Sequence, residues 1–501
     1  MTYQLYKPLR NHLRKYSLLP SLAAIRAYAQ YLQFDQPFPD YVQVAPEFLA
    51  AAPERKGVHE WQLELLAREL ILNATENSKI DMRVYKNFAS TVAKLKAVED
   101  SIVGCAAYRH LYEENVFREL YRMSHRQMPW QQQPNSSDYL RYFKIFGHAD
   151  LNAILERTIG LNAQQLYTLG LGFSGMYLEH FGLNDPIRFE MEGILEQEHI
   201  DQFTQRFSIE IDDLKKNVAE AQSYDQDFAY TMNPLLITPL VWVTQFGKRT
   251  LIAPIPTYVL RRVTEGIYYE IYDAVGFSAA YGESFQEYVG EVLVATTEAF
   301  ACDILAEQEY QVGRDRKDSV DWIMEDNTAT IFVECKTKKV RFEAKVSLAD
   351  AAALDRDLDK MAEFVVQVYK TLADALNGNY IHWQQDGRPI YPMVVNLEEW
   401  YAFGDGIIPA IDERARVRLA AAGLEPEMLQ QYPYSICSVK DLEYSAAIMG
   451  QVGIQTYMQL KNDEEHRLWT HGSFIRRHYY QEMNERPDLF RDAWQQIHPG
   501  L

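Results

Sequence analysis

The sequence predicts an α+β protein, in which a mainly helical N-terminal half is followed by an α/β sandwich core. Apolar residues recur at helical spacing in residues 61–66, 107–123 and 151–169. Between residues 283 and 397, a helix, three strands, a helix and a further strand follow one another. A chain of 501 residues also exceeds one ordinary core. We therefore expect three parts, namely a helical regulatory or recognition domain at 1–225, an α/β domain at 226–410 and a mixed α/β extension at 411–501.

The expected elements follow from the positions where apolar runs meet turn residues. After residue 225 we expect a hairpin turning at Gly247, helices at 258–275, 283–305 and 348–376, and strands at 308–312, 319–324, 329–336, 390–397 and 434–439. Residues 170–175, Gly-Leu-Gly-Phe-Ser-Gly, match a dinucleotide-binding fingerprint by letter. They follow a helical stretch and no strand, so we expect a turn between helices there.

Composition predicts a folded protein that does not span a membrane. Hydrophobic residues make up 47% of the chain and aromatic residues 13%, as in globular proteins. The most apolar stretches, at 235–243 and 251–255, are far shorter than the roughly 18 residues of a membrane helix. The N-terminus lacks the apolar core of a signal peptide, and the four cysteines are scattered without metal or disulfide spacing. A cytoplasmic location is expected.

The net charge of −20 argues against binding nucleic acid by bulk electrostatics, because phosphate contacts require Lys and Arg. A nuclease with a locally basic site is still compatible with this charge. Lys336, Lys338, Lys339, Arg341 and Lys345 form such a basic cluster. The same residues would equally suit a solvated strand edge that lysines protect against aggregation, and the sequence leaves both interpretations open.

Two acidic residues and a lysine near the ends of neighbouring strands form the candidate site. Asp321 lies in the apolar run at 320–323, and Glu334 and Lys336 close the run at 331–336. Side chains alternate along a strand, so Glu334 and Lys336 share one face. Carboxylates on adjacent strands can bind a hard divalent cation, which prefers oxygen ligands. We predict that the three side chains converge at the edge of a hairpin.

The main alternative for these three residues is a cross-strand ion pair on an exposed sheet edge, which is worth under about 1 kcal/mol. Similar triplets of an acidic residue, any residue and Lys occur at 54–56, 213–215, 315–317 and 343–345. None of them ends an apolar strand-like run with a second such run shortly before it. Sequence context therefore selects Glu334.

A longer pattern surrounds the candidate site. Gly282, Phe285 and Gln286 open a helix, Asp321 and then Glu334-Cys335-Lys336 follow on strands, and Gln367 and Lys370 lie one turn apart on the next helix. This order resembles the PD-(D/E)XK nuclease superfamily, which has the restriction-endonuclease-like fold. The similar segment covers under a quarter of the chain. One position departs from the family pattern, because Gln286 stands where the family has a helix Glu and brings no negative charge.

The resemblance implies a role for each of these residues. Asp321, Glu334 and the carbonyl of Cys335 would bind Mg²⁺ or Mn²⁺, and Lys336 would position a water or stabilise charge on the phosphate. Gln286 would contact a metal-bound water, and one tightly held ion is expected. Gln367, Lys370, Lys338 and Lys339 would contact the nucleic-acid backbone, although a solvated helix face explains Gln367 and Lys370 equally well.

Two classes of function are compatible with these residues. The first is a metal-dependent nuclease that hydrolyses DNA, in which the helical half senses or gates; bacterial defence would suit this architecture by analogy only. The second is a non-catalytic nucleic-acid-binding or scaffold protein on a degenerate nuclease fold, which net acidity and Gln286 favour. The residues do not separate DNA from RNA, and they leave open a homo-oligomer or a protein partner bound through the helical half.

Overall fold

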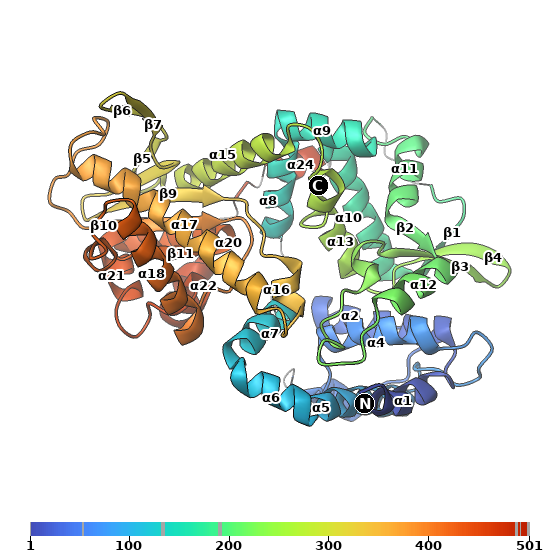
Figure 1. Cartoon of the computed structure of the whole chain (residues 1–501). Helices are drawn as coiled ribbons and strands as arrows, with labels where there is room; N and C mark the ends of the chain where they lie inside the picture. Colours follow the sequence, from blue (N-terminus) through green and yellow to red (C-terminus); the bar gives the residue numbers. More distant parts are fainter. Residues whose placement is uncertain are drawn as a thin grey trace. The chain divides into compact units, whose positions relative to one another are not determined.

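The computed structural model describes residues 2–52, 55–131, 136–188, 193–485, 489–490 and 492–497. The protein is α+β, with helices first and mixed sheets after them (Figure 1). The chain forms two compact units: unit 1 comprises Met1–Phe277, Lys345–Ala349 and Asp492–Leu501, and unit 2 comprises Ser278–Ala344 and Asp350–Arg491. The boundary near residue 277 differs from the predicted one at 225. Most of residues 411–501 belong to unit 2 and form no separate part.

Unit 1 is built mainly from helices, as the periodicity predicts. Its core stacks Tyr28 on Phe88 with ring centroids 3.6 Å apart, and Arg26 donates a 2.7 Å hydrogen bond to the carbonyl of Tyr177. The first ten helices are α1 (Thr2–Leu13), α2 (Leu18–Phe34), α3 (Pro46–Ala50), α4 (Glu60–Asn73), α5 (Tyr85–Val103), α6 (Ala106–Glu114), α7 (Val116–Gln131), α8 (Ser136–Gly147), α9 (Ala149–Ile159) and α10 (Ala163–Glu179).

Residues 170–175 lie inside α10 and do not form the predicted turn. A Cβ at Gly170 would lie 2.8 Å from Val263 and 2.9 Å from the Tyr139 hydroxyl. A glycine here therefore permits close packing of the helix. The match of residues 170–175 to a nucleotide-binding loop is a coincidence of sequence.

A small four-stranded sheet in unit 1 contains the predicted hairpin. Phe246 and Gly247 both have positive φ at its turn, the backbone that a two-residue hairpin loop needs. The strand order is β1 (Gly182–Asn184), β4 (Lys248–Ile252), β3 (Leu240–Gln245) and β2 (Ser208–Glu210). The helices near it in sequence are α11 (Gln197–Phe207), α12 (Ile211–Ala221), the 3₁₀ helix η2 (Pro234–Leu236), α13 (Thr257–Val263) and α14 (Tyr268–Ile271).

The prediction of a single helix at 258–275 is wrong, because the chain forms two helices, α13 and α14, with a break between them. Gly266 donates its N–H to the carbonyl of Arg261 at 2.9 Å, which ends α13. A Cβ at Gly266 would lie 3.0 Å from backbone atoms of Arg261 and Arg262. The close return of the backbone at this glycine explains the break.

Unit 2 is organised around a five-stranded mixed sheet. Strands β9, β10 and β11 run parallel, and β8 and β5 continue the sheet antiparallel. The strand order is β11 (Ser435–Ser438), β10 (Ile390–Asn396), β9 (Thr330–Lys336), β8 (Trp322–Glu325) and β5 (Asp303–Ala306), and a separate hairpin pairs β6 (Glu309–Val312) with β7 (Asp315–Asp318). All seven residues of β10 are buried, so both faces of the sheet are covered at its centre.

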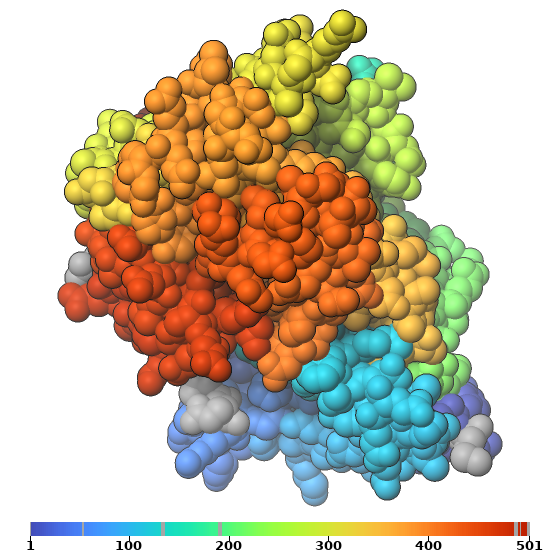
Figure 2. All heavy atoms as spheres, turned by 60° about the vertical axis from the view of Figure 1, so that its left-hand side comes forward, coloured from blue at the N-terminus to red at the C-terminus, as the bar shows by residue number. Residues whose placement is uncertain are grey.

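The helices of unit 2 cover this sheet. Helix α17 packs on β9 and β10, α18 packs on α17, and α20 contacts β10 and β11 (Figure 1). In space-filling view the orange and red atoms of these late segments form one continuous surface (Figure 2). The helices that follow α14 are α15 (Phe277–Thr297), α16 (Phe342–Val346), α17 (Ala351–Leu376), α18 (Gly404–Ala421), α19 (Met428–Gln431), α20 (Val439–Val452), α21 (Ile454–Lys461), α22 (His471–His478), α23 (Tyr480–Glu485) and, in unit 1, α24 (Ala493–Ile497).

Helix α15 ends at Thr297, earlier than the predicted residue 305, because Leu305 belongs to edge strand β5. The predicted strands at 308–312, 319–324, 329–336, 390–397 and 434–439 each correspond to an observed strand within a few residues. No helix among the described residues is both long and apolar enough to cross a bilayer.

Candidate active site

The structure brings Asp321, Glu334 and Lys336 together at one end of the β8–β9 pair. Trp322 pairs with Val333 as the last residues of this antiparallel ladder, so Asp321 lies opposite Glu334 immediately beyond it. The backbone N–H of Cys335 donates to Oδ2 of Asp321 at 2.5 Å, which fixes that carboxylate beside β9. The predicted convergence is confirmed for these three residues.

Lys336 forms an ion pair with Glu334. Its Nζ lies 2.5 Å from Oε1 of Glu334, and the side chains are 18% and 4% exposed, respectively. Nζ also lies 5.3 Å from the ring centroid of Phe364 on α17, over its face. The ammonium group therefore remains partly open to solvent while the Glu334 carboxylate is buried beneath it.

Both carboxyl groups are difficult to ionise. Burial, followed by repulsion from Asp321, raises the pKa of Glu334 to about 7, against the lowering effect of Lys336. Burial likewise raises the pKa of Asp321 to about 6, although the Cys335 N–H and the charge of Lys336 lower it. An ordinary surface ion pair would lower the pKa of its carboxylate, so the single ammonium group of Lys336 does not compensate the desolvation of Glu334 and Asp321.

Gln286 reaches this site through a residue that sequence reasoning missed. Gln286 on α15 donates from Nε2 to Oε2 of Glu307 at 2.9 Å, and the N–H of Glu307 donates to the carbonyl of Asp321 at 2.8 Å. The charge of Glu307 raises the pKa of both Asp321 and Glu334. Glu307 follows edge strand β5 and has no spacing relation to the other acids, so the sequence carries no signal for it.

A second missed residue is Asn396, at the end of β10. It pairs in register with Lys336 on β9, and in-register neighbours of adjacent strands point to the same face. Asn396 is only 1% exposed, yet neither its amide nitrogen nor its amide oxygen has a hydrogen-bond partner among the described residues. Buried polar groups are normally paired, so this amide is available to a water or a substrate group. In the sequence, Asn396 is marked only as the polar residue that ends an otherwise apolar strand.

The residues expected to contact nucleic acid lie in different environments. Gln367 and Lys370 are exposed on α17, and Lys338 is partly exposed. Lys339 is buried and forms an ion pair with Glu398, which removes it from the residues that could contact a backbone at the surface. Arg341 is held by both oxygens of Asp357. The basic cluster is therefore partly committed to internal pairing, which corrects the expectation for Lys339.

The described residues around Asp321 and Glu334 form no closed metal cage. Within the part of the chain that the structure describes, no three His, Cys, Asp or Glu side chains are grouped so as to hold a metal ion. The carboxylates of the buried Glu334 and the partly buried Asp321 could together hold a divalent cation, which prefers oxygen ligands. The Cys335 carbonyl and water would have to complete the oxygen ligands.

Comparison of the chain with protein-family models, curated protein sequences and solved structures finds no match. The functional argument therefore depends on the geometry of the site.

Proposed function

We propose that the protein is a metal-dependent nuclease of PD-(D/E)XK type that hydrolyses phosphodiester bonds, with DNA as the expected substrate. The observation that supports this proposal is a buried and a partly buried carboxyl group, both with raised pKa values, beside a partly exposed lysine. Perturbed acids of this kind cluster at functional sites. A mixed sheet on which α17 packs, and which α15 contacts through Trp322, agrees with the restriction-endonuclease-like fold that the sequence motifs suggest.

The residues would divide the work as follows. A cation held by Asp321 and Glu334 would neutralise charge on the scissile phosphate and lower the pKa of a bound water. Lys336 would then donate hydrogen bonds to a phosphoryl oxygen or to the attacking water. The N–H of Cys335 keeps the Asp321 carboxylate oriented. Gln286 orients Glu307 at the edge of the site, and the unpartnered amide of Asn396 would bind substrate or water beside Lys336.

The proposal is tested by measuring degradation of linear and plasmid DNA with Mg²⁺ or Mn²⁺, for the wild type and for Lys336→Ala. Removing one preorganised electrostatic group at a reacting centre costs about 100-fold or more in rate, and we expect a loss of that size. Lys360→Ala is the matched control, because its Nζ also lies over the Phe364 ring, at 5.1 Å, but pairs with Glu363. Equal cleavage by the wild type and Lys336→Ala would refute the assignment. RNA in parallel reactions identifies the substrate.

The second candidate is a non-catalytic nucleic-acid-binding or scaffold protein on the same fold. The ion pair between Lys336 and Glu334 favours it, because a degenerate site can be closed by such a contact. Calorimetric titration with Mn²⁺ separates the two candidates. A nuclease site should bind Mn²⁺ and lose that binding in Asp321→Asn and Glu334→Gln, whereas a dead site should show no binding that depends on these two residues.

A further inference from the structure

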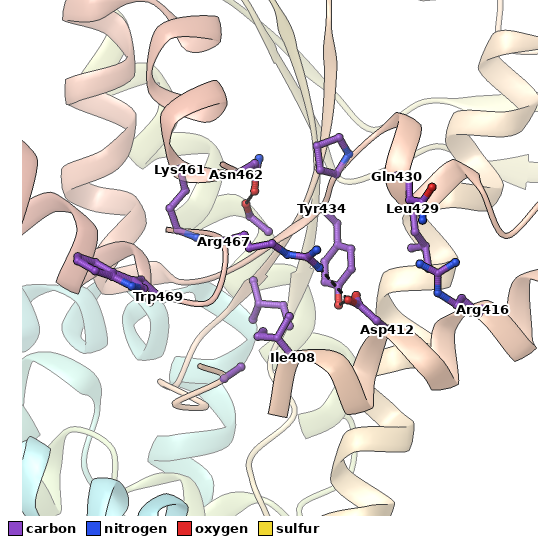
Figure 3. A pocket seen from close by; sticks show the side chains of 14 residues that line it. Ile408, Asp412, Arg416, Leu429, Gln430, Tyr434, Lys461, Asn462, Arg467 and Trp469 are labelled. Carbon is purple, nitrogen blue, oxygen red and sulfur yellow. Dashed lines mark hydrogen bonds and ion pairs between the residues drawn. The ribbon is translucent and has the colours of Figure 1, made fainter. Parts of the chain in front are cut away.

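Unit 2 contains a cavity of about 300 Å³ at the far edge of its sheet, beside β11 (Figure 3). Its wall comes from α18, α19, β11, the end of α21 and the chain that follows α21. The lining is partly apolar, through Ile408, Leu429, Ile436 and Trp469, and otherwise polar or charged. This volume is at the lower end of the range for small-molecule sites.

The charged groups of the cavity have an excess of positive charge. Arg416, Lys461 and Arg467 contribute three positive charges and Asp412 one negative charge, so the lining carries a net charge of +2. Asp412 is already occupied, because it accepts hydrogen bonds of 2.8 Å from the Tyr434 hydroxyl and from Arg467. Figure 3 shows Arg467 and Tyr434 pointing at this carboxylate, so the only acidic side chain of the lining is already engaged.

Lys461 is the decisive residue, because it is a buried cation without an ion-pair partner. It is 2% exposed, and within the described segments its Nζ makes only a 3.3 Å hydrogen bond to the carbonyl of His466. Burial lowers the pKa of Lys461 to about 8, so the group is still mostly protonated at neutral pH. An uncompensated buried charge is costly, and an anion in the cavity would relieve that cost.

Two further groups provide unused hydrogen-bond donors. The amide nitrogen of Asn462 is buried and has no partner among the described residues, while its oxygen accepts a 3.3 Å bond from Ser435. Arg416 makes no ion pair or hydrogen bond with any residue that the structure describes. In the view of Figure 3, Arg416 lies on the Leu429 and Gln430 side of the cavity, and Lys461 and Asn462 lie on the other.

We propose that this cavity binds a phosphate monoester with a planar apolar body, of which nucleoside 5′-monophosphates are the best-fitting class. A lining charge of +2 complements a phosphate monoester, which carries about −1.5 to −2 at neutral pH. The phosphate accepts hydrogen bonds from Lys461, Asn462 and Arg467. The ring packs on Ile408 and Leu429, where the free guanidinium of Arg416 stacks on its face.

The cavity is separate from the candidate nuclease site, so the inference does not depend on the proposed function. Ile436 of β11 pairs with Val394 of β10, which pairs with Glu334 of β9. Two strand spacings therefore lie between the cavity edge and the candidate catalytic residues.

The test is isothermal titration of the full-length protein with the four nucleoside 5′-monophosphates, in EDTA so that the metal site does not contribute. We expect at least one of them to bind, and adenosine and inorganic phosphate to bind at least about tenfold more weakly than it does. Arg416→Ala and Lys461→Met should each weaken binding at least about tenfold. Arg477→Ala, which removes an exposed arginine on α22, should bind as the wild type does.

Three results would overturn the inference: no binding of any of the four nucleotides, wild-type affinity in Arg416→Ala, or inorganic phosphate binding as tightly as the nucleotides. Lys461→Met removes a buried side chain, so circular dichroism must confirm that this variant folds. Arg416→Ala changes a partly exposed residue and decides the question if Lys461→Met does not fold.

Discussion

At Glu334, the pKa shift has the opposite direction to the one expected of an exposed ion pair, the main alternative for this site. A structural ion pair at a sheet edge holds its carboxylate ionised and lowers the pKa. Instead, burial and Asp321 raise the pKa of Glu334 to about 7 although Lys336 lies 2.5 Å away. Ionising Glu334 is therefore less favourable in the folded protein than in the unfolded chain. Groups kept in unfavourable protonation environments are characteristic of sites that act on a ligand.

Asn396 provides a stability test of the same idea. Replacing a buried, unpartnered amide by an apolar group of similar size removes a desolvation cost. We therefore expect Asn396→Leu to increase the free energy of unfolding by about 1 kcal/mol, as measured by urea denaturation. The same variant should cleave DNA more slowly, because the amide that neighbours Lys336 is lost.

Asn233→Leu is the control for Asn396→Leu, since Asn233 is equally buried but caps η2 through a 3.1 Å bond to the N–H of Leu235. This control should lose stability. A loss of stability in Asn396→Leu itself would show that the amide has a partner in solution and would contradict the prediction.

Residue-level prediction succeeded where strand alternation alone was sufficient. Glu334 and Lys336 are two residues apart on one strand, and Asp321 immediately precedes the strand that pairs with it in a hairpin. Asn396 and Glu307 could not be predicted in this way. Asn396 joins the site because β10 pairs in parallel with β9 after a long crossover connection. Glu307 joins it because the chain after edge strand β5 bonds to Asp321.

At the scale of elements, α15 is positioned by the contact of a glycine with a tryptophan. The Trp322 indole donates to the carbonyl of Gln286 at 2.9 Å, and a Cβ at Gly290 would lie 2.1 Å from the same ring. This contact places Gln286 at the candidate site. Neither the ring nor the helix backbone can yield cheaply, since β8 holds Trp322 in the sheet.

We expect Gly290→Ala to lower the free energy of unfolding by about 1–3 kcal/mol through overpacking. Gly282→Ala is the matched control in the same helix, because a Cβ there has no atom within 4 Å. It should be neutral or stabilising by up to about 1 kcal/mol, since Ala favours helix more than Gly. Equal midpoints for the two variants in chemical denaturation would contradict this account of how α15 is held.

Elements with strong periodicity and clear ends were predicted closely, including β9, β10 and α17. The errors occur where tertiary contacts override local signals. Gly170 continues a helix because Val263 packs against it, whereas Gly266 breaks one because the backbone returns onto Arg261. The residue type is the same in both cases, so only the tertiary contacts of each glycine determine whether the helix continues or ends there.

At the scale of the whole molecule, the division into units could not be predicted from the sequence. Residues 345–349 and 492–501 belong to unit 1 although most of the chain around them belongs to unit 2. Composition and linkers identify boundaries only when each unit is continuous in sequence. The predicted boundaries at 225 and 410 reflect changes in the pattern of apolar and turn residues along the chain, and neither is a division between compact units.

A partly buried acid pair predicts how stability depends on pH. Burial, followed by repulsion from Asp441, raises the pKa of Glu399 to about 7, although the N–H of Tyr401 donates to it at 2.9 Å. The folded state therefore holds this proton more tightly than the unfolded state. The contribution of Glu399 to stability is full below about pH 4.5 and is lost as pH rises through about 7.

We expect Glu399→Gln to keep the accepting oxygen for Tyr401 while removing this pH-dependent cost. The gain in the free energy of unfolding over the wild type should be near zero at pH 5 and of the order of 1 kcal/mol at pH 8. Glu413→Gln removes the same charge from an exposed position on α18 and should show no such pH-dependent gain. Denaturant titrations at the two pH values measure both variants. If the gain of Glu399→Gln does not increase with pH, the pKa of Glu399 is not raised in the folded protein and the prediction is contradicted.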